Sequence, residues 1–398
     1  MRTVGIIVEY NPLHNGHLYH LQQAKLAAQA DAVIAVMSGD FLQRGEPAIV
    51  SKWARTEMAI QAGVDLVIEL PSRYATSAAE RFAYGAIRTL DATGIVDYLC
   101  FGSEHGNISP FLTLAEQIET ESSSFKETLA AQLQLGVSYP TAYANTIQTI
   151  CQTEQLQFDA SQPNNTLGLF YVLALLRIKS SIQPLTIQRI ASAYADQEPS
   201  HASIASATAL RNAILKNTHA IDNYVPASTL RILQREFATD CGPITWDSLY
   251  PSLLHQLATL PTQQLKEIHD VQEGLENRLK QAIYAMDVSS FANLIDTLST
   301  KRYTRTHLQR VLTNVLLNRT SADLLPYIRV LGFTAKGQQL LKKMRHTAKA
   351  PLISRVTKSH FQLLEEDLKA SYIHTLGYPA PSRDQLRREL IQRPITCE

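Results

Sequence analysis

The hydrophobic pattern divides the chain into two regions. Up to about residue 105, short apolar runs alternate with amphipathic stretches, which predicts buried strands separated by helices. The expected strands span 4–9, 32–37, 64–70 and 98–101, and the expected helices lie near 16–30, 52–62 and 77–93. Alternation of this kind predicts a parallel sheet with helices on both faces.

From residue 109 to about 176 the pattern becomes helical, with Pro110, Pro140 and Pro163 as breaks. One more strand is expected at 184–191, followed by a helix from 205. Beyond residue 217 strand patterns mostly vanish, and helices are expected at 226–237, 248–260, 264–284, 291–298, 307–317 and 335–344. We therefore predict an α/β fold: a Rossmann-like domain with a parallel sheet over 1–217, followed by an α-helical region over 218–398.

Composition describes an ordinary globular protein. Hydrophobic residues make up 45% and charged residues 18% of the 398 positions. The longest apolar run, residues 168–176, is too short to span a bilayer, and Glu9 interrupts the N-terminal run, so neither a membrane span nor a signal peptide is expected. The four cysteines lack zinc-type spacing, which favours a reducing, cytoplasmic location without a structural metal.

The most informative motif follows the first expected strand and reads Asn11-Pro12-Leu13-His14-Asn15-Gly16-His17. In open α/β sheets ligands bind at the carboxyl ends of strands, and a helix start there offers N–H groups to an anion. His14 and His17 are spaced to share a face of that helix and could donate hydrogen bonds to an α-phosphate. This HxGH pattern is typical of nucleotidyltransferases and favours an ATP site; the alternative is that both histidines only cap the helix.

Other polar segments follow the remaining expected strands. The loop 38–47 carries Asp40 and Arg44, which are candidates for binding acetate or phosphate; the alternative is a turn that Asp40 holds as a helix cap. Lys52 and Arg55 open the next helix and could either meet a triphosphate or serve the structure. Gly102 ends a strand, where it would let adenosine pack on the backbone.

A second set of candidates lies between residues 163 and 211. Asn165, at the start of a helix, is free to contact a ligand if Asn164 supplies the cap. Arg189 ends the last expected strand. Ser206, Thr208 and Arg211 surround the next helix start, where hydroxyl, N–H and guanidinium groups suit an anion. The segment resembles the helix start that binds the β- and γ-phosphates in nucleotidyltransferases.

Charge is uneven along the chain. Residues 301–360 contain thirteen Lys or Arg and one acid, Asp323. A solvated surface normally mixes acids with bases, so this segment favours a nucleic-acid partner. Lys301, Arg302, Tyr303 and Arg305 combine cations with an aromatic ring, a composition expected of contacts with single-stranded RNA.

The chain resembles the bacterial tRNA(Met) cytidine acetate ligases over most of its length. The matching segments are GIIVEYNPLHNGH, SGDFLQRGEPAIV, KWARTEMAIQAGVDLVIELP, FGSE, PNNTLGL and YIRVLGFTAKGQQLL. The resemblance implies that ATP and acetate form acetyl-adenylate, and that the acetyl group passes to the wobble cytidine of elongator tRNA(Met). The ATP site that it implies comprises Ile7, Val8, Glu9, Tyr10, Asn11, Pro12, Leu13, His14, Asn15, Gly16, His17, Leu18, Tyr19, His20, Gly102, Asn165, Arg189 and Ile190.

These observations predict a nucleotidyltransferase domain that uses ATP with Mg²⁺ and acts on acetate and tRNA. Acetate suits a confined subsite near Asp40 and Arg44. One departure is that Ala205 stands where this superfamily motif commonly has a second serine or threonine, which removes one phosphate contact. Two alternatives stay open: a small-molecule adenylyltransferase of the NAD or coenzyme A precursor type, and a noncatalytic nucleotide- and RNA-binding module. The sequence does not determine the oligomeric state.

Overall fold

A mostly parallel sheet organises the protein. The structure, a computed structural model, describes residues 1–120, 122–137, 139–189, 205–216, 221–300, 303–320 and 327–397. Within them the strand order is β5-β4-β1-β2-β3-β6-β7, β8 pairs with β6, and only the β3–β6 pairing is antiparallel. The strands are β1 Thr3–Val8, β2 Ala32–Ser38, β3 Leu66–Leu70, β4 Tyr98–Ser103, β5 Gln183–Gln188, β6 Ile328–Phe333, β7 Leu352–Ile353 and β8 Ile395–Thr396.

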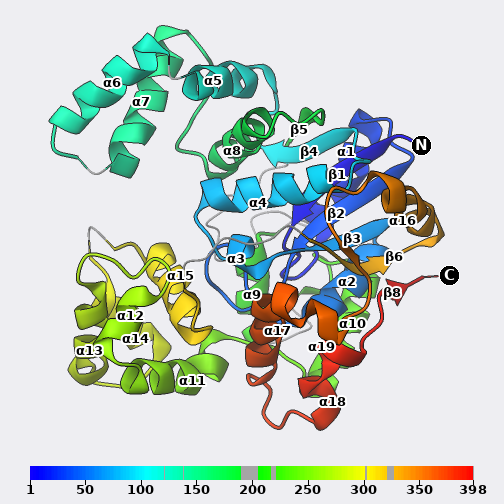
Figure 1. The fold of residues 1–398 in the computed structure, drawn as a ribbon, viewed down its shortest axis with the longest axis vertical. Helices are drawn as coiled ribbons and strands as arrows, with labels where there is room; N and C mark the ends of the chain where they lie inside the picture. Colours follow the sequence, from blue (N-terminus) through cyan, green and yellow to red (C-terminus); the bar gives the residue numbers. More distant parts are fainter. Residues whose placement is uncertain are drawn as a thin grey trace.

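Helices cover both faces of this sheet and form a separate lobe at one side (Figure 1). Those of the first region are α1 Asn15–Ala27, α2 Lys52–Gln61, α3 Ser72–Ala75, α4 Ala79–Ala92, α5 Ser109–Glu119, α6 Ser123–Gln134, α7 Tyr139–Thr153, α8 Pro163–Arg177 and α9 Ala207–Lys216. Those that follow are α10 Ala227–Ala238, α11 Trp246–Thr259, α12 Thr262–Glu267, α13 Leu275–Ala285, α14 Phe291–Leu298, α15 Arg305–Leu316, α16 Ala335–Thr347, the 3₁₀ helix η2 Lys358–His360, α17 Phe361–Thr375, α18 Arg383–Leu386 and α19 Arg388–Ile391. None of the helices in these described segments is long and apolar enough to cross a bilayer.

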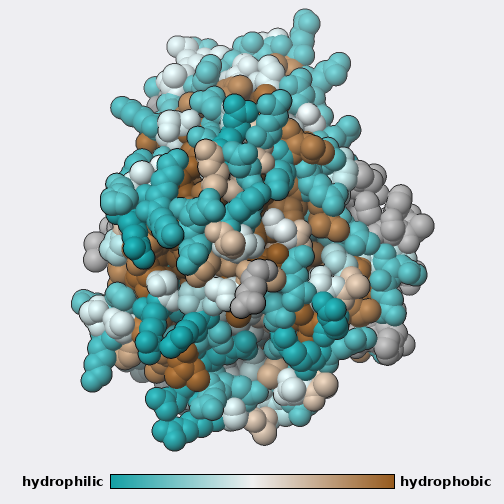
Figure 2. Space-filling view, turned by 90° about the vertical axis from the view of Figure 1, so that its right-hand side faces the viewer, coloured by the Kyte–Doolittle hydropathy of each residue, from teal (hydrophilic) through white to brown (hydrophobic). Residues whose placement is uncertain are grey.

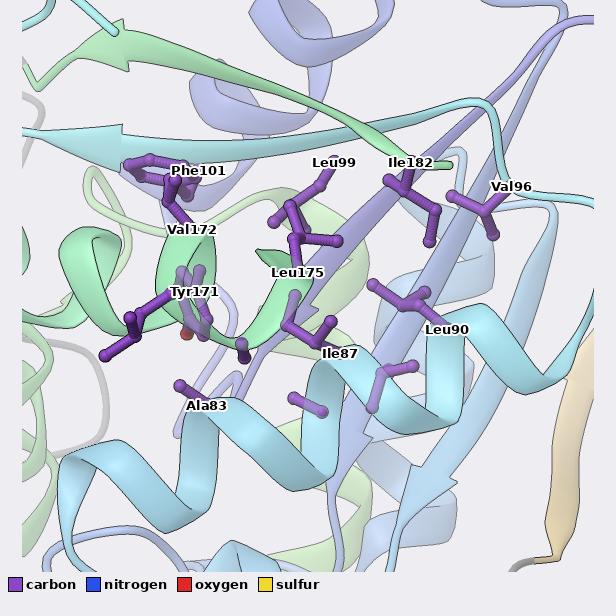
Figure 3. Close-up of a cluster of buried hydrophobic side chains, with 14 of the residues drawn as sticks. Ala83, Ile87, Leu90, Val96, Leu99, Phe101, Tyr171, Val172, Leu175 and Ile182 are labelled. Atoms are coloured by element: carbon purple, nitrogen blue, oxygen red, sulfur yellow. The ribbon is translucent and has the colours of Figure 1, made fainter. Parts of the chain in front are cut away.

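Strand periodicity explains why the sheet is covered on both sides. Ile34 and Val36 of β2 join the core with α4, α5 and α8, whereas Val33, Ala35 and Met37 join the core with α1, α2, α9 and α10. Figure 3 shows the first of these cores, in which α4 and α8 pack against β4. The predicted α/β fold with its parallel sheet is therefore confirmed.

The chain beyond residue 217 is largely helical, as expected, but it also contributes three strands that were not predicted, β6, β7 and β8, to the sheet. β6 runs antiparallel to β3 and extends the sheet, with Leu66 opposite Phe333. Its short apolar run could equally be a buried helical segment, because only pairing with β3 decides between the two. The predicted helix 264–284 is also two helices, α12 and α13, separated by a bridge between Ile268 and Thr320 and by Gly274 at φ +86°.

Helices α11 to α15 form a lobe with its own core, which includes Leu253, Leu294 and Leu312. The lobe holds the tip of the loop between β2 and α2. Trp246 Nε1 and Thr313 Oγ1 both donate to the Gly45 carbonyl, at 3.0 and 3.1 Å. Gly45 has φ +72°, and a Cβ there would lie 2.4 Å from the backbone of α15, so only glycine fits.

Candidate nucleotide-binding site

A cavity of about 250 Å³ lies where the strand order reverses, at the carboxyl ends of β1 and β4. This is the position at which open α/β sheets bind ligands. The start of α1, the start of α9 and the loop 42–46 complete its walls. It is lined by most of the residues that the sequence predicted: Ile7, Val8, Glu9, Tyr10, Asn11, His14, Gly16, His17, Tyr19, His20, Arg44, Gly102, Arg189, Ser206, Thr208 and Arg211.

Other predicted residues do not line this cavity, namely Pro12, Leu13, Asn15, Leu18, Asp40 and Asn165. Leu13 is buried in the core beneath the turn. Asn15 Nδ2 donates to the Asn223 carbonyl at 3.0 Å, and Asn15 N donates to the Tyr224 carbonyl at 2.9 Å. Ile190 lies outside the described residues.

His14 and His17 form a stacked pair with ring centroids 3.7 Å apart. His14 Nδ1 accepts from Gly16 N at 3.1 Å, and His17 Nδ1 accepts from His14 N at 3.3 Å. A neutral imidazole that accepts at Nδ1 carries its proton on Nε2. The helix caps therefore fix both rings as Nε2–H donors, so a capping role does not exclude a ligand contact through Nε2.

Burial keeps both rings neutral. Together with the positive charges of Arg189 and Arg211, it lowers the pKa of His14 to about 3. Burial, with His14, Arg189 and His20 nearby, also holds the pKa of His17 well below its usual value. Both side chains can thus donate hydrogen bonds at neutral pH, as stabilisation of a phosphate oxygen requires.

The α9 wall carries the second set of residues that the sequence predicted to bind phosphate. Ser206 Oγ caps the helix by accepting from Ala209 N at 3.1 Å. Arg211 donates to the Asn11 carbonyl, to Thr208 Oγ1 and, at 3.1 Å, to Glu46 Oε2. Ala205, the departure noted in the sequence, also lines the cavity. A helix N-terminus beside an arginine attracts an anion.

Gly102 at the end of β4 and the asparagines at the start of α8 make contacts that the sequence did not predict. A Cβ on Gly102 would lie 3.2 Å from Arg189 Cγ, so the glycine leaves room for that arginine. Asn164 lines the cavity, whereas Asn165 Oδ1 accepts from His105 N at 3.1 Å and Asn165 Nδ2 donates to the Asp159 carbonyl at 3.0 Å. A nucleotide contact by the Asn165 side chain would require an exchange of these bonds.

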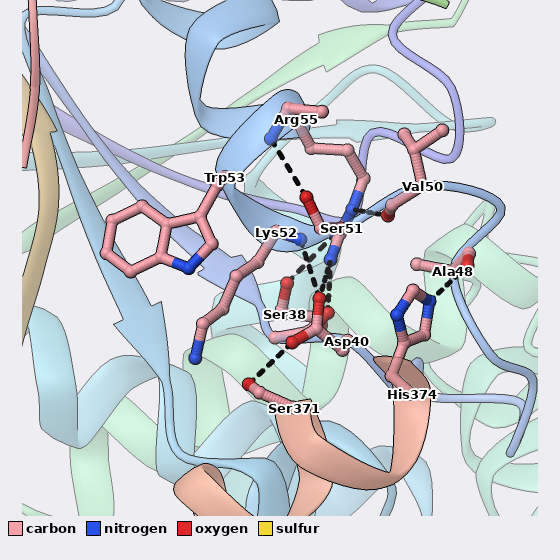
Figure 4. Close-up of polar contacts among 12 residues, drawn as sticks. Ser38, Asp40, Ala48, Val50, Ser51, Lys52, Trp53, Arg55, Ser371 and His374 are labelled. Atoms are coloured by element: carbon pink, nitrogen blue, oxygen red, sulfur yellow. Dashed lines mark hydrogen bonds and ion pairs between the residues drawn. The ribbon is translucent and has the colours of Figure 1, made fainter. Parts of the chain in front are cut away.

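Lys52 and Arg55 belong to a buried network behind the cavity, which answers the question that the sequence left open (Figure 4). Lys52 Nζ lies 2.7 Å from Glu69 Oε1 and 2.9 Å from Glu389 Oε2. Arg55 donates to the Glu9 carbonyl at 2.7 Å and to the Ser38 carbonyl at 3.0 Å. Both side chains are fully buried and serve the structure.

Asp40 is part of the same network. It accepts from Lys52 N at 2.6 Å and from Ser371 Oγ at 2.6 Å. Burial alone would raise its pKa, but His374, Lys52, Arg55 and the Ser371 hydroxyl together lower the pKa to about 2. Asp40 therefore fixes the loop 38–47 as an ionised carboxylate, and of the two acetate candidates only Arg44 lines the cavity.

Several lining residues were not candidates in the sequence. They are Leu42, Gln43, Glu46, Phe82, Phe101, Asn164, Leu167, Tyr171, Ile187 and Ala207. An apolar residue such as Tyr171 on a buried helix has the same sequence pattern as a core residue, so no local signal distinguishes it. Glu46 and Gln43 belonged to a recognised loop, and their position after β2 was the available signal.

The basic segment 301–360 does not form one surface. Lys301, Arg302 and Asp323 lie outside the described residues, while Tyr303 stacks on His307 and Arg305 pairs with Asp296 at 3.4 Å. Arg319 and Arg329 are buried. The exposed cations are largely those of α16 and its flanks, Lys336, Lys342, Lys343, Arg345, Lys349, Arg355 and Lys358.

Helices α15 and α16 stand on opposite sides of the molecule (Figure 1). Figure 2 shows the α16 side, which hydrophilic side chains largely cover. α16 packs near the amino end of β3, since Thr334, just before the helix, donates its N–H to the Asp65 carbonyl. It is thus remote from the cavity at the carboxyl ends.

Comparison with known proteins gives consistent matches. The profile of the HIGH Nucleotidyl Transferase family matches residues 1–389. The tRNA(Met) cytidine acetate ligase of Geobacillus sp. is 42% identical and that of Bacillus subtilis 41%, with 99% and 97% of this chain and 99% and 94% of those proteins covered. The crystal structure of Thermotoga maritima TmcAL bound with alpha-thio ATP is similar at a TM-score of 0.89 and 31% identity, covering 100% of this chain and 99% of that one.

Proposed function

The chain belongs to the HIGH nucleotidyl transferase family and, within it, to the tRNA(Met) cytidine acetate ligases, and from this premise we propose a two-step reaction in the cavity. ATP and acetate first form acetyl-adenylate and pyrophosphate. The acetyl group then passes to the exocyclic amine of the wobble cytidine of elongator tRNA(Met), which gives N4-acetylcytidine. The observation that carries the proposal is the pair of neutral histidines, held as Nε2–H donors opposite the α9 start.

We assign the walls of the cavity to separate parts of ATP. His14 and His17 donate to the α-phosphate as charge develops on it when acetate attacks. Arg189, Arg211 and the α9 start bind the β- and γ-phosphates that leave. Acetate binds beside Arg44. Such a reaction relies on positioning and charge stabilisation, and needs no nucleophilic side chain.

Mg²⁺ enters, in this proposal, as the complex with ATP. Among the described residues no group of three or more His, Cys, Asp or Glu side chains is placed to hold a metal ion. Phosphate oxygens and water are ligands that Mg²⁺ prefers, and the ion would offset part of the triphosphate charge.

We further propose that the two predicted regions divide the work. Residues 1–217 activate acetate, and residues 218–398 bind the tRNA, while β6 to β8 complete the sheet of the first region. Of the basic segment, the predicted RNA-binding residues Lys301, Arg302, Tyr303 and Arg305 are assigned to the RNA. The support is that α15, which Arg305 begins, belongs to the lobe that holds the cavity loop at Gly45.

The direct test is incubation of the protein with ATP, labelled acetate and tRNA(Met), followed by mass spectrometry of the nucleosides. We expect labelled N4-acetylcytidine at the wobble position and ATP–pyrophosphate exchange that depends on acetate. Exchange that proceeds without acetate would indicate a small-molecule adenylyltransferase instead, and an absence of exchange would indicate a binding module.

Replacing Arg211 with alanine should raise the KM for ATP about ten- to a hundredfold, because a hydrogen bond to a charged group is worth ~1.5–3 kcal/mol. The KM for tRNA should change much less. Arg235→Ala is the matched control, since Arg235 also pairs with carboxylates, Glu57 and Glu236, but lies outside the cavity. A selective loss of tRNA affinity in the Arg211 variant would contradict the assignment.

Reversing Lys301, Arg302 and Arg305 to glutamate should weaken tRNA binding and spare acetyl-adenylate synthesis. Each lost phosphate contact should reduce the slope of log affinity against log salt by roughly 0.7–0.9. The control reverses Lys342, Lys343 and Arg345 on α16, which makes an equal charge change on the side of the molecule opposite α15, the helix that Arg305 begins. If the α16 variant lost tRNA binding and the first one kept it, the RNA would lie on the other face.

A further inference from the structure

The charged groups of the cavity are separated by sign. Arg189, Arg211 and the two histidines surround the space assigned to the triphosphate. Two carboxylates, Glu9 and Glu46, lie at the end of β1 and on the loop 42–46. Carboxylates repel a triphosphate, so their presence in an ATP cavity calls for a different partner.

The two carboxylates have different surroundings. Glu46 Oε2 lies 3.1 Å from Arg211 Nη2 and therefore acts as the counter-ion of that arginine. Glu9 Oε1 accepts from Gln43 N at 2.7 Å, with Ser38 Oγ at 3.5 Å, while Glu9 Oε2 accepts no hydrogen bond from any described residue. Glu9 is thus held in place by one oxygen, which leaves the other available within the cavity.

The second step of the proposed reaction needs a proton acceptor. The lone pair of an exocyclic amine on cytosine is delocalised into the ring, which makes this amine a weak nucleophile. Its nitrogen must lose a proton as the bond to the acetyl carbon forms, and a positioned carboxylate can accept that proton. The histidines cannot readily do so, because each ring presents Nε2–H to the cavity and uses Nδ1 in the α1 cap.

We propose that Glu9 is the general base of acetyl transfer, an inference that rests on the proposed function. The lone pair of the cytidine amine forms the new C–N bond to the acetyl carbonyl carbon. The bond from that carbon to the phosphate oxygen breaks, and its electron pair leaves with AMP. The proton of the amine passes to Glu9 Oε2 and later to water. Glu9 takes no part in the attack of acetate on ATP, because acetate is already an anion.

The groups around Glu9 suit this role. Burial raises the pKa of its carboxyl, the hydrogen bond from Gln43 N lowers it, Glu46 raises it, and Arg211 and Arg55 lower it, with a net rise above the usual value. A base whose pKa is closer to neutrality than that of a free carboxylate transfers protons more effectively. Because the ionised form is the active one, transfer should fall as the pH drops through this pKa.

Glu9→Gln tests the assignment while preserving the local structure, because the amide oxygen can still accept from Gln43 N. The measurement is single-turnover acetyl transfer to tRNA(Met) alongside acetate-dependent ATP–pyrophosphate exchange. We expect the ratio of transfer to exchange to fall by about 10²–10⁴, the usual contribution of a general base. An unchanged ratio would overturn the proposal, since a residue that only anchors the loop would be replaced well by glutamine.

Two further measurements separate the possible failures. In the wild-type protein the rate of acetyl transfer should rise with pH and then level. The Glu9→Asp variant should show such a rise at a lower absolute rate. A transfer rate independent of pH in both proteins would exclude a carboxylate base, even if the Glu9→Gln variant did not fold. Glu46→Gln should instead lower the KM for ATP in the exchange reaction, because it removes a carboxylate that repels the triphosphate and frees Arg211 to bind phosphate. It should leave the ratio of transfer to exchange close to that of the wild-type protein; a fall like that of Glu9→Gln would overturn the assignment of the base. An absence of acetate-dependent exchange in the wild-type protein would refute the proposed function itself.

Discussion

His17→Ala should lower the rate of acetyl-adenylate formation by ~10²–10³, the usual cost of removing one preorganised donor to developing charge. The ring of His17 is held by His14 N and stacked on His14, so a water molecule in its place would lack both constraints. The measurement is acetate-dependent pyrophosphate exchange at saturating ATP, with circular dichroism to verify folding.

The matched control is His255→Ala, because His255 lies exposed on α11 in the helical lobe. It should exchange pyrophosphate at the wild-type rate. Normal exchange in the folded His17 variant would refute the role assigned to the histidine pair at the α-phosphate.

Lys52→Ala should reduce the free energy of unfolding by ~3–5 kcal/mol, because it leaves the buried carboxylates of Glu69 and Glu389 without their cation. Burial lowers the pKa of Lys52, but the charges of Glu389, Glu69 and Asp40 raise this pKa by more than burial lowers it. The ammonium therefore stays charged in the folded protein. Denaturant unfolding followed by tryptophan fluorescence would measure the change in the free energy of unfolding. Trp53 is a suitable probe, because its Nε1 donates to Glu389 Oε1 at 2.6 Å, beside the substituted lysine.

The exposed pair of Lys349 and Asp91 provides the comparison. It has the same N–O distance of 2.7 Å, but the Lys349 side chain is 62% exposed. Lys349→Ala should therefore cost no more than ~1 kcal/mol, because solvent screens an exposed pair. Equal losses for the two variants would mean that the buried network contributes little beyond its Coulomb attraction in water.

The sequence was most informative where local pattern and tertiary role coincide. A buried strand that ends in a histidine-glycine turn can be recognised from local sequence. The helix start at Ser206 alone has the pattern of an ordinary N-cap, and it becomes a candidate only when it is paired with that turn. Both line the cavity. The first strands were also predictable, because β-branched runs bounded by turns have few alternatives in an alternating α/β pattern.

Distant contacts decide the rest. The sequence is compatible with a phosphate contact by Lys52. The structure instead places Lys52 beside Glu389, which follows it by more than 300 residues in the chain. Cations adjacent in sequence were expected to share one surface, yet Arg329 is buried while Lys342 lies exposed on α16. Asn164 and Asn165 are neighbours, yet Asn164 lines the cavity while the Asn165 side chain accepts a hydrogen bond from His105 N. A single sequence gives no measure of such contacts.

The antiparallel pairing of β3 with β6 has a consequence for the newly made protein. β3 leaves the ribosome long before β6, whose residues 329–333 pair with 66–69. At bacterial synthesis rates of ~5–20 residues per second, the wait lasts tens of seconds. During this time the nascent chain presents an unpaired, apolar strand edge, the kind of surface that promotes aggregation. We expect ribosome-bound chains that end before residue 328 to require holdase chaperones, and protease resistance of the N-terminal half to appear only after β6 has emerged.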